Sequence, residues 1–314
     1  MLRLLLHRLA ATVPVLLLVT LGVFTLLHLT PGDPIDTMMS ESADASAKAH
    51  LRRELGLDQP IPVQYVHWMS RVVRGDLGKS IRNGEPVIEN VARRIRPSVQ
   101  LALFAMTVSV LIAFPVGIVS AVRRNTAVDR AGTTFALFGI CMPNFLLALL
   151  LMFVFGVTLR WLPISGYVDP LEEGWDGVRS LVLPAVTLGL ALAAVITRTL
   201  RSSLLEALAE DYVRTARAKG VTEWGVIVGH VLKNAMIPVV TVLGLQLGTL
   251  IGGAVITEYV FALPGVGRLV VDAVFARDYP LVQGVILLIA VGFIVSNLLV
   301  DLLYGVLDPR IRVR

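Results

Sequence analysis

The sequence has little cysteine and few charged side chains, and both shortages exclude functions. Its one cysteine, Cys141, rules out a disulfide within the chain and leaves a thiolate metal site without a second ligand. Charged residues make up 16% of the chain, against about 25% in soluble globular proteins. Together with a mean hydropathy of +0.76, this deficit excludes intrinsic disorder and a water-facing enzyme. The composition therefore predicts one membrane-embedded body.

Catalytic and nucleotide-binding motifs are also missing. The sequence contains no HExxH or GxSxG pattern, and its histidines have no metal-ligand spacing. Gly78-Lys79-Ser80 looks like the end of a phosphate-binding loop, but Val73 stands where that loop requires its first glycine. Gly265-Val266-Gly267 lacks the third glycine of a dinucleotide site. We therefore expect no catalytic centre and no ATP site in this chain.

What the sequence does contain is long apolar runs. A helix rises 1.5 Å per residue, so about 20 apolar residues cross a hydrocarbon layer of roughly 30 Å. Six segments fit this pattern, the fourth being the shortest: Leu9–Leu29, Val99–Val122, Thr133–Leu159, Leu181–Thr197, Met236–Phe261 and Leu281–Leu307. The predicted fold class is all-α, a polytopic membrane protein with six transmembrane helices.

The basic residues lie in short loops between these runs, and this predicts the orientation of the chain. Lysine and arginine in short loops resist translocation, so the loops that carry them stay in the cytoplasm. Arg123, Arg124 and Arg130 follow the second run, and the basic residues after the fourth run begin with Arg198 and Arg201. Both loops and both termini are predicted to be cytoplasmic. This distribution explains the net charge of +5 better than nucleic-acid binding, for which the arginines would line one stripe.

Residues 30–98 are predicted to form an external cap. A helix is expected over residues 43–55, with Ser42 as its N-terminal cap and Gly56 at its end. A second amphipathic helix follows Pro62. The pattern fits two interpretations equally: a lid that packs on its own membrane domain, and a docking surface for another protein.

The fifth apolar run carries small and polar residues at helical spacing. Glycines recur every four residues at Gly244, Gly248 and Gly252, so they line one helix face and let another helix approach closely. Gln246 and Thr249 lie among them and are costly in lipid unless they face protein or water. Two interpretations follow: polar contacts that hold helices together, or the lining of a transport pathway.

Residues 198–235 form a predicted cytoplasmic loop with a helical pattern. Charged residues alternate with apolar ones up to Gly220, which ends the helix, and a second amphipathic run extends from Trp224 to Leu232. Such a hairpin is either a solvated loop or an element that inserts into a groove of a partner protein.

Several motifs, taken in order along the whole chain, resemble those of the membrane subunits of ABC importers. The similarity is to the first permease subunit of the dipeptide and oligopeptide uptake systems. The motifs are Thr30-Pro-Gly-Asp-Pro34, Leu55-Gly-Leu-Asp-Gln-Pro60, Gly75-Asp-Leu-Gly-Lys-Ser80, Asp211-Tyr-Val-Arg-Thr-Ala-Arg-Ala-Lys-Gly220, Leu263-Pro-Gly-Val-Gly267 and Arg277-Asp-Tyr279. In this family Gly78-Lys79-Ser80 belongs to an external motif and not to a nucleotide site.

The resemblance implies the fold of a type I ABC importer permease and a place in a larger complex. Its partners would be a second, similar but distinct permease subunit, two cytoplasmic ATPases and an external solute-binding protein that delivers peptide. The chain would need no cofactor, because ATP and Mg²⁺ would bind to the ATPases. It would be a non-catalytic, multi-pass subunit of the bacterial cell membrane. We accordingly divide it into residues 1–29 with the first span, the cap 30–98 and a core permease domain 99–314.

The short segment that engages the ATPases in this family corresponds to Ala216-x3-Gly220. The resemblance therefore assigns coupling to Tyr212, Ala216, Arg217, Ala218, Lys219 and Gly220. The segment departs from the general ABC pattern at Arg214-Thr215, where Glu-Ala is common. Arg217 and Lys219 are expected to add weak contacts to acidic groups of the partner.

Three other functions are alternatives to peptide import: import of another cargo, secondary transport and hydrolysis within the membrane. Some members of the family carry nickel or glutathione instead of peptides. A secondary transporter would drive uptake through carboxylates inside the membrane, but Glu258 and Asp301 both lie near the ends of their spans. A membrane-embedded hydrolase is disfavoured by the missing catalytic groups.

Overall fold

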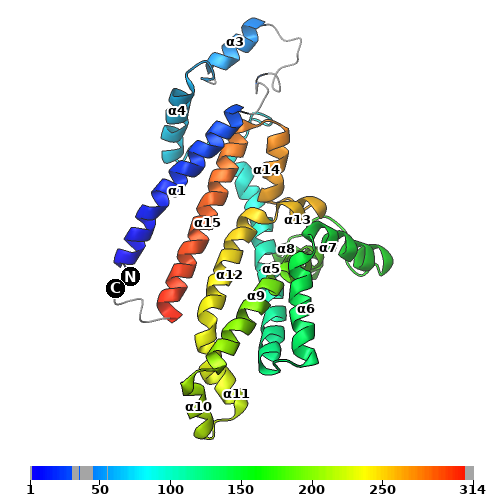
Figure 1. Cartoon of the computed structure of the whole chain (residues 1–314). Coiled ribbons are helices and arrows are strands. Elements are labelled where there is room, and N and C mark those ends of the chain that lie inside the picture. Colours follow the sequence, from blue (N-terminus) through cyan, green and yellow to red (C-terminus); the bar gives the residue numbers. More distant parts are fainter. Residues whose placement is uncertain (1, 30–34, 36–44, 55, 308–314) are drawn as a thin grey trace. The chain divides into compact units, whose positions relative to one another are not determined.

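The computed structural model describes residues 2–29, 35, 45–54 and 56–307. Within these residues the regular structure is helical, apart from an isolated β-bridge between Lys79 and Pro86. The elements, shown in Figure 1, are α1 (Leu2–Leu29), α3 (Ala45–Glu54), α4 (Ile61–Val73), α5 (Val87–Val122), α6 (Ala127–Cys141), α7 (Asn144–Leu151), the π-helical η1 (Met152–Thr158), α8 (Pro170–Glu173), α9 (Trp175–Leu208), α10 (Asp211–Ala218), α11 (Glu223–Val226), the π-helical η2 (Ile227–Val231), α12 (Leu232–Gly253), α13 (Val255–Val260), α14 (Val266–Phe275) and α15 (Tyr279–Leu307). The all-α prediction is confirmed.

Length and composition identify the helices that can cross a membrane. In the described part of the chain four helical stretches satisfy both criteria: Val87–Val122, Trp175–Leu208, Glu223–Leu250 and Tyr279–Leu299. A fifth span results if α6 and the continuous α7–η1 helix are taken together. The first predicted span lies on α1, in which Ala11–Thr25 is a shorter apolar stretch. Each predicted span therefore lies on helical structure, as expected for a polytopic membrane protein.

The third predicted span is bent sharply in its middle. α6 ends at Cys141 and α7 begins at Asn144, and the two helices meet at 105°. The cause is Pro143, which has no backbone N–H and disfavours helical torsion angles at the residue before it. Met142 is accordingly extended, with ψ of 123°. The prediction of one continuous helix over residues 133–159 is wrong at this point.

The fourth and fifth predicted spans end at other residues than expected. α9 continues to Leu208, so Arg198 and Arg201 lie inside this helix and not in a loop. Charged side chains mark where a helix leaves the hydrocarbon layer, but they do not end its backbone hydrogen bonding. α12 ends at Gly253, and the separate helix α13 follows it. The connection between the fourth and fifth spans therefore begins after Leu208.

The chain forms two compact units, and the larger contains residues 97–263 and the described chain from Phe293 onward. In this unit α6, α7 and α12 pack against α9 (Figure 1). Of the most apolar stretch of α9, 72% is buried, against 28–33% for the other three spanning stretches. A Cβ at Gly189 of α9 would lie 2.7 Å from Val108 Cγ1, so this glycine lets α5 approach closely. α9 is the central helix of the unit.

The other unit contains residues 2–96 and 264–292. Its core joins the loop before α5 to α14 and the first turns of α15, through residues such as Leu77, Val87, Leu269 and Leu281. α4 packs beside α1 (Figure 1): the ring centroids of Tyr65 and Phe24 are 5.4 Å apart. This unit therefore includes part of the predicted external cap.

The helices predicted in the cap are confirmed. The expected helix over residues 43–55 corresponds to α3, which ends at Glu54 before Gly56, whose φ is +69°. The second corresponds to α4, beginning at Ile61. Ser42, the predicted cap of the first helix, lies outside the described residues.

Candidate functional site

The segment after α9 folds into a short helical hairpin at the ends of α9 and α12 (Figure 1). α10 and α11 form its two arms, and Gly220 between them has φ of +77°. The Gly220 N–H donates to the carbonyl oxygen of Arg217 over 2.9 Å, and the Val221 N–H donates to that of Ala216 over 3.3 Å. Because a positive φ favours glycine, Gly220 ends α10 and reverses the chain, as predicted.

An ion pair joins the two arms of the hairpin. Arg217 Nε donates to Glu223 Oε1 over 2.8 Å, and Arg217 Nη2 donates to Oε2 over 3.2 Å. The two side chains are 44% and 65% exposed, so the pair contributes less than about 1 kcal/mol to stability. The bidentate contact links the two sides of the turn at Gly220. Arg217 was expected to face acidic groups of a partner, whereas here its guanidinium binds Glu223 of its own chain.

The candidate residues of the hairpin divide between an inner and an outer face. Ala216 is 8% exposed and belongs to the apolar core of the larger unit, together with the completely buried Val213, which was not among the candidates. The other candidates are all exposed: Tyr212, Arg217, Ala218, Lys219 and Gly220. Trp224, which was not among the candidates, is 68% exposed. Ala216 therefore packs the hairpin against its own chain, and its expected contact with a partner stays a prediction.

α12 carries the predicted row of glycines. Gly244 and Gly248 are buried, and a Cβ at Gly248 would lie 2.7 Å from two ring carbons of Phe293 on α15. That distance is too short for any side chain, so Gly248 is needed for the close approach of the ring. Gly252 belongs to α12, but its surroundings lie outside what the structure describes. At Gly248 the row therefore packs α12 against α15.

The polar residues between these glycines form hydrogen bonds within α12. The hydroxyl of Thr249, an exposed residue, donates to the carbonyl oxygen of the half-buried Gln246 over 2.8 Å. Thr241 similarly donates to the carbonyl oxygen of Ile237 over 3.1 Å. Such bonds satisfy a hydroxyl inside an apolar run. These two threonines therefore require neither a water-filled path nor a second helix.

α13 buries an acidic side chain. Glu258 is 1% exposed, and the hydroxyl of Ser98 on α5 donates to its Oε1 over 2.6 Å. A carboxyl group near a span is costly unless protein groups surround it, and here they do. Asp301 belongs to α15, but its side chain lies outside the described residues.

An ion pair that sequence reasoning did not find joins α6 to α9. Nε and Nη2 of Arg201 donate to the two carboxylate oxygens of Asp129 over 2.6 and 2.8 Å. The backbone N–H of Asn125 donates to the same carboxylate over 2.9 Å. The Asp129 side chain is 5% exposed and that of Arg201 is 27% exposed. Two residues so far apart in sequence share no local pattern that could have paired them.

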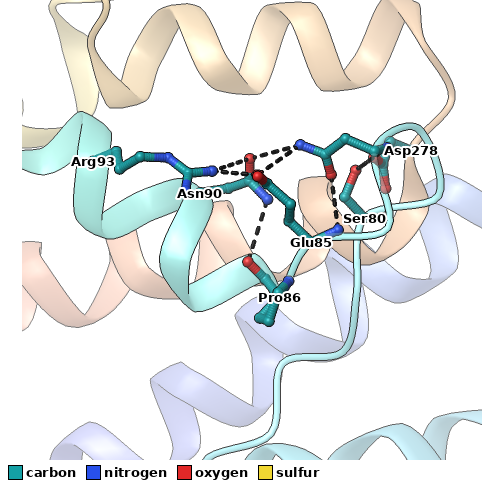
Figure 2. A network of polar contacts seen from close by, with 7 residues as sticks. Ser80, Glu85, Pro86, Asn90, Arg93 and Asp278 are labelled. Atoms are coloured by element: carbon teal, nitrogen blue, oxygen red, sulfur yellow. Dashed lines mark hydrogen bonds and ion pairs between the residues drawn. The ribbon is translucent and has the colours of Figure 1, made fainter.

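A second network holds the loop that contains Gly78-Lys79-Ser80 (Figure 2). Asp278 is 1% exposed and accepts a hydrogen bond from the Ser80 hydroxyl. The carboxylate also accepts from the backbone N–H groups of Ile81, over 3.1 Å, and Leu281, over 3.3 Å. The Ser80 hydroxyl thus donates its hydrogen bond to Asp278, directly before α15.

The same loop is tied to the beginning of α5. Glu85 forms an ion pair with Arg93, and the side-chain amide of Asn90 donates to the carbonyl oxygen of Pro86 over 3.2 Å (Figure 2). The motif containing Ser80 was quoted for its resemblance alone, and Asp278 stood in another quoted motif. The structure brings the two motifs together.

The hairpin and the glycine row are separate sites. Gly244 lies twelve residues into α12, which is roughly 18 Å along a helix at 1.5 Å per residue. Apolar helices packed around a buried central helix define the class: a polytopic helical membrane protein.

Comparison with known proteins identifies the family. Residues 113–313 match the family described as "Binding-protein-dependent transport system inner membrane component". Residues 1–102 match a family described as "Binding-prot-dependent transport system membrane comp, N-term". The chain belongs to the binding-protein-dependent inner membrane components, and is thus an ABC importer permease subunit, a multi-pass protein of the bacterial inner membrane. This confirms the resemblance seen in the motifs.

Individual relatives cover nearly the whole chain. The "Glutathione transport system permease protein GsiC" of Salmonella choleraesuis (strain SC-B67) is 46% identical over 312 residues, which is 99% of each chain. The "Probable peptide ABC transporter permease protein y4tP" of Sinorhizobium fredii (strain NBRC 101917 / NGR234) is 43% identical over 307 residues, or 98% of each chain. Both relatives are named as membrane transport components and not as enzymes.

A solved structure shares the fold. A chain of the MetNI methionine ABC transporter, determined in an inward-facing conformation, matches with a TM-score of 0.60 at 18% identity. The match covers 71% of this chain and 99% of that one. The type I permease fold expected from the motifs is therefore present.

Proposed function

We propose that this chain forms half of the translocation pathway of an ATP-driven peptide importer, and that the α10–α11 hairpin couples it to cytoplasmic ATPase subunits. The second half would be a similar but distinct permease, and an external binding protein would deliver the cargo. ATP and Mg²⁺ would bind to the ATPases. Peptides are favoured because one relative is named for peptide transport and another for glutathione, which is itself a tripeptide.

The observation that carries the coupling proposal is the build of the hairpin. Val213 and Ala216 anchor its inner face in the core around α9. Its outer face exposes a tyrosine, a tryptophan and a lysine: Tyr212, Trp224 and Lys219. Exposed aromatic side chains on a rigid support are typical of the central contacts of protein interfaces. A solvated connector would need neither the buried anchors nor the Arg217–Glu223 pair.

The connections of the hairpin suggest how force would reach the spans. α9 ends at Leu208 and α10 begins at Asp211, while η2 links the other arm directly to α12. Closure of two ATPases on ATP would move the hairpin, and packed helices respond to such a push by shifting as rigid bodies. The two helices that flank the hairpin, α9 and α12, would rock together. The permease would then alternate between an inward-facing and an outward-facing state, because ATP binding to the ATPases stabilises one of these states relative to the other.

The external cap is proposed to contribute to docking of the binding protein. One face of α4 is used for packing on α1, through Tyr65 and the 6%-exposed Trp68. Its other side chains include Val63, Val66 and Val73, which are 39%, 62% and 80% exposed. This leaves an apolar surface on α4 for an external partner. Because Leu77 and Ser80 belong to the buried part of this unit, the test changes only exposed side chains of residues 42–80: replacement of Val66 and Val73 by serine should weaken stimulation of ATP hydrolysis by the loaded binding protein while the complex still assembles.

Uptake into proteoliposomes tests the proposed function. The chain is reconstituted with its second permease and ATPases, and the binding protein is loaded with a dipeptide, a tripeptide, glutathione or nickel. We expect accumulation of a peptide that requires ATP on the ATPase side and persists when ion gradients are collapsed. Glutathione as the sole accepted cargo would favour the second candidate, supported by the relative named for it. Uptake that follows an ion gradient without ATP would contradict the proposal.

A further inference from the structure

A polar cavity that is open to the surface lies between α6 and α9, away from the hairpin residues and the glycine row. Its volume is about 450 Å³, and it is lined by Asn125, Asp129, Arg130, Thr133, Thr134 and Arg201. Cavities of this size hold small ligands or parts of larger ones. Because α6 begins directly after the Arg123–Arg124 loop, the positive-inside rule places the cavity on the cytoplasmic side.

The lining has one unbalanced positive charge and several hydrogen-bond donors. Asp129 and Arg201 neutralise each other, and their pairing uses the Nε and Nη2 atoms of the arginine. A guanidinium has five N–H donors, so Arg201 keeps others for a further acceptor. Arg130 is exposed, and no ion pair joins it to an acidic side chain of the described chain. The Thr133 side chain is hydrogen-bonded to Asp129, whereas Thr134 adds a further hydroxyl to the lining, so the complementary ligand is an anion with several oxygen atoms.

The surface of α6 beyond the cavity points to the kind of anion. Residues three and four positions apart share a helix face, so Arg130, Thr133 and Thr134 are followed on the same face by Leu137 and Phe138. These two side chains are 53% and 62% exposed. This face of α6 is therefore charged near its cytoplasmic N-terminal end, then polar, and apolar towards its C-terminal end. A phospholipid has the same order: phosphate, glycerol and acyl chains.

We propose that this cavity binds a phosphate group, supplied in the membrane by the headgroup of an anionic phospholipid of the cytoplasmic leaflet. Arg130 and the remaining donors of Arg201 bind the phosphate oxygens, and the acyl chains lie along Leu137 and Phe138. Basic pockets between spans on the cytoplasmic side suit such headgroups electrostatically. A soluble phosphate ester offers the same chemistry to the arginines but would leave the apolar part of the face uncovered.

Native mass spectrometry of the purified full-length protein in detergent tests the site, with phosphatidylglycerol as the probe. Replacement of Arg130 by glutamine (R130Q) should lower the affinity for the first bound lipid at least tenfold, because charge-assisted hydrogen bonds are lost. T134V removes one hydroxyl with little change of shape and should lower it several-fold. R124Q is the matched control: it removes an exposed arginine from the same side of the membrane without touching the cavity, and should bind as the unchanged protein does.

A competition experiment separates the two sources of phosphate. If millimolar inorganic phosphate leaves the lipid bound, the headgroup assignment holds. If it displaces the lipid, the cavity is still a phosphate site, but one filled from solution. R130Q and T134V proteins that bind phosphatidylglycerol as tightly as R124Q would overturn the proposal.

Discussion

Replacement of Gly220 by valine should strain the turn between α10 and α11. Gly220 has φ of +77°, a conformation that costs a residue with a Cβ roughly 1–2 kcal/mol and is least tolerated by β-branched side chains. No heavy atom lies within 4 Å of a Cβ built at this position, so the cost is conformational and not a clash. A penalty of about 1–2 kcal/mol lowers the ratio of native to distorted turns about 5- to 30-fold.

The assay combines ATP-dependent uptake with ATP hydrolysis stimulated by the loaded binding protein, in proteoliposomes that hold the whole complex. We expect Gly220→Val to insert in the membrane normally but to lose uptake, with either a loosened complex or hydrolysis that no longer depends on cargo. Gly220→Asn should retain most coupling, because asparagine tolerates positive φ. Gly229→Val is the matched control, since Gly229 has open space and no left-handed backbone. A Gly220→Val complex that assembles and transports at the normal rate would refute the role of this turn.

Two further changes test the packing of the helices. Gly248→Leu should destabilise the protein by about 1–3 kcal/mol, because its Cβ would lie 2.7 Å from the ring of Phe293; Leu245→Val, on the exposed side of α12, is the control. Equal thermal unfolding of these two variants would remove the argument for close packing at Gly248. Asp278→Ala should cost about 3 kcal/mol, because it leaves without their acceptor a buried hydroxyl, the buried N–H of Leu281 and the partly buried N–H of Ile81. Asp272→Ala changes a side chain that is 41% exposed and should cost less than about 1 kcal/mol, so similar unfolding of both aspartate variants would contradict the network's importance.

Local patterns predicted the long apolar helices but not all of their ends, and they did not predict α8 or α14. Each of the six apolar runs lies on a helix, although only four stretches, or five with the bent pair, are long and apolar enough to cross a membrane in the described part of the chain. Gly56 correctly marked the end of α3. Hydropathy reports where a chain meets lipid, whereas a helix continues as long as its backbone is hydrogen-bonded. α9 therefore runs past Arg201 into the cytoplasmic side. The break at Pro143 had a signal in the sequence, because proline disfavours helix at the residue before it, but apolar length outweighed that signal.

Long-range pairs had no signal in a single sequence. Ser80 and Asp278 belong to motifs almost two hundred residues apart, and Asp129 meets Arg201 only because α6 packs on α9. Periodicity describes one helix at a time and does not say which helices become neighbours. The burial of Ala216 was missed for the same reason, since α10 is amphipathic and either face could have been the inner one.

The most direct test of the account asks what the hairpin touches. A photo-crosslinking amino acid is incorporated in place of Lys219, an exposed residue of the hairpin, and separately in place of Leu171, which is 79% exposed in the loop predicted to be external. Irradiation of cells that express the assembled importer should join the Lys219 position to an ATP-binding subunit and the Leu171 position to none. An assembled complex in which the Lys219 position gives no such product, or in which the Leu171 position does, would contradict coupling through the α10–α11 hairpin.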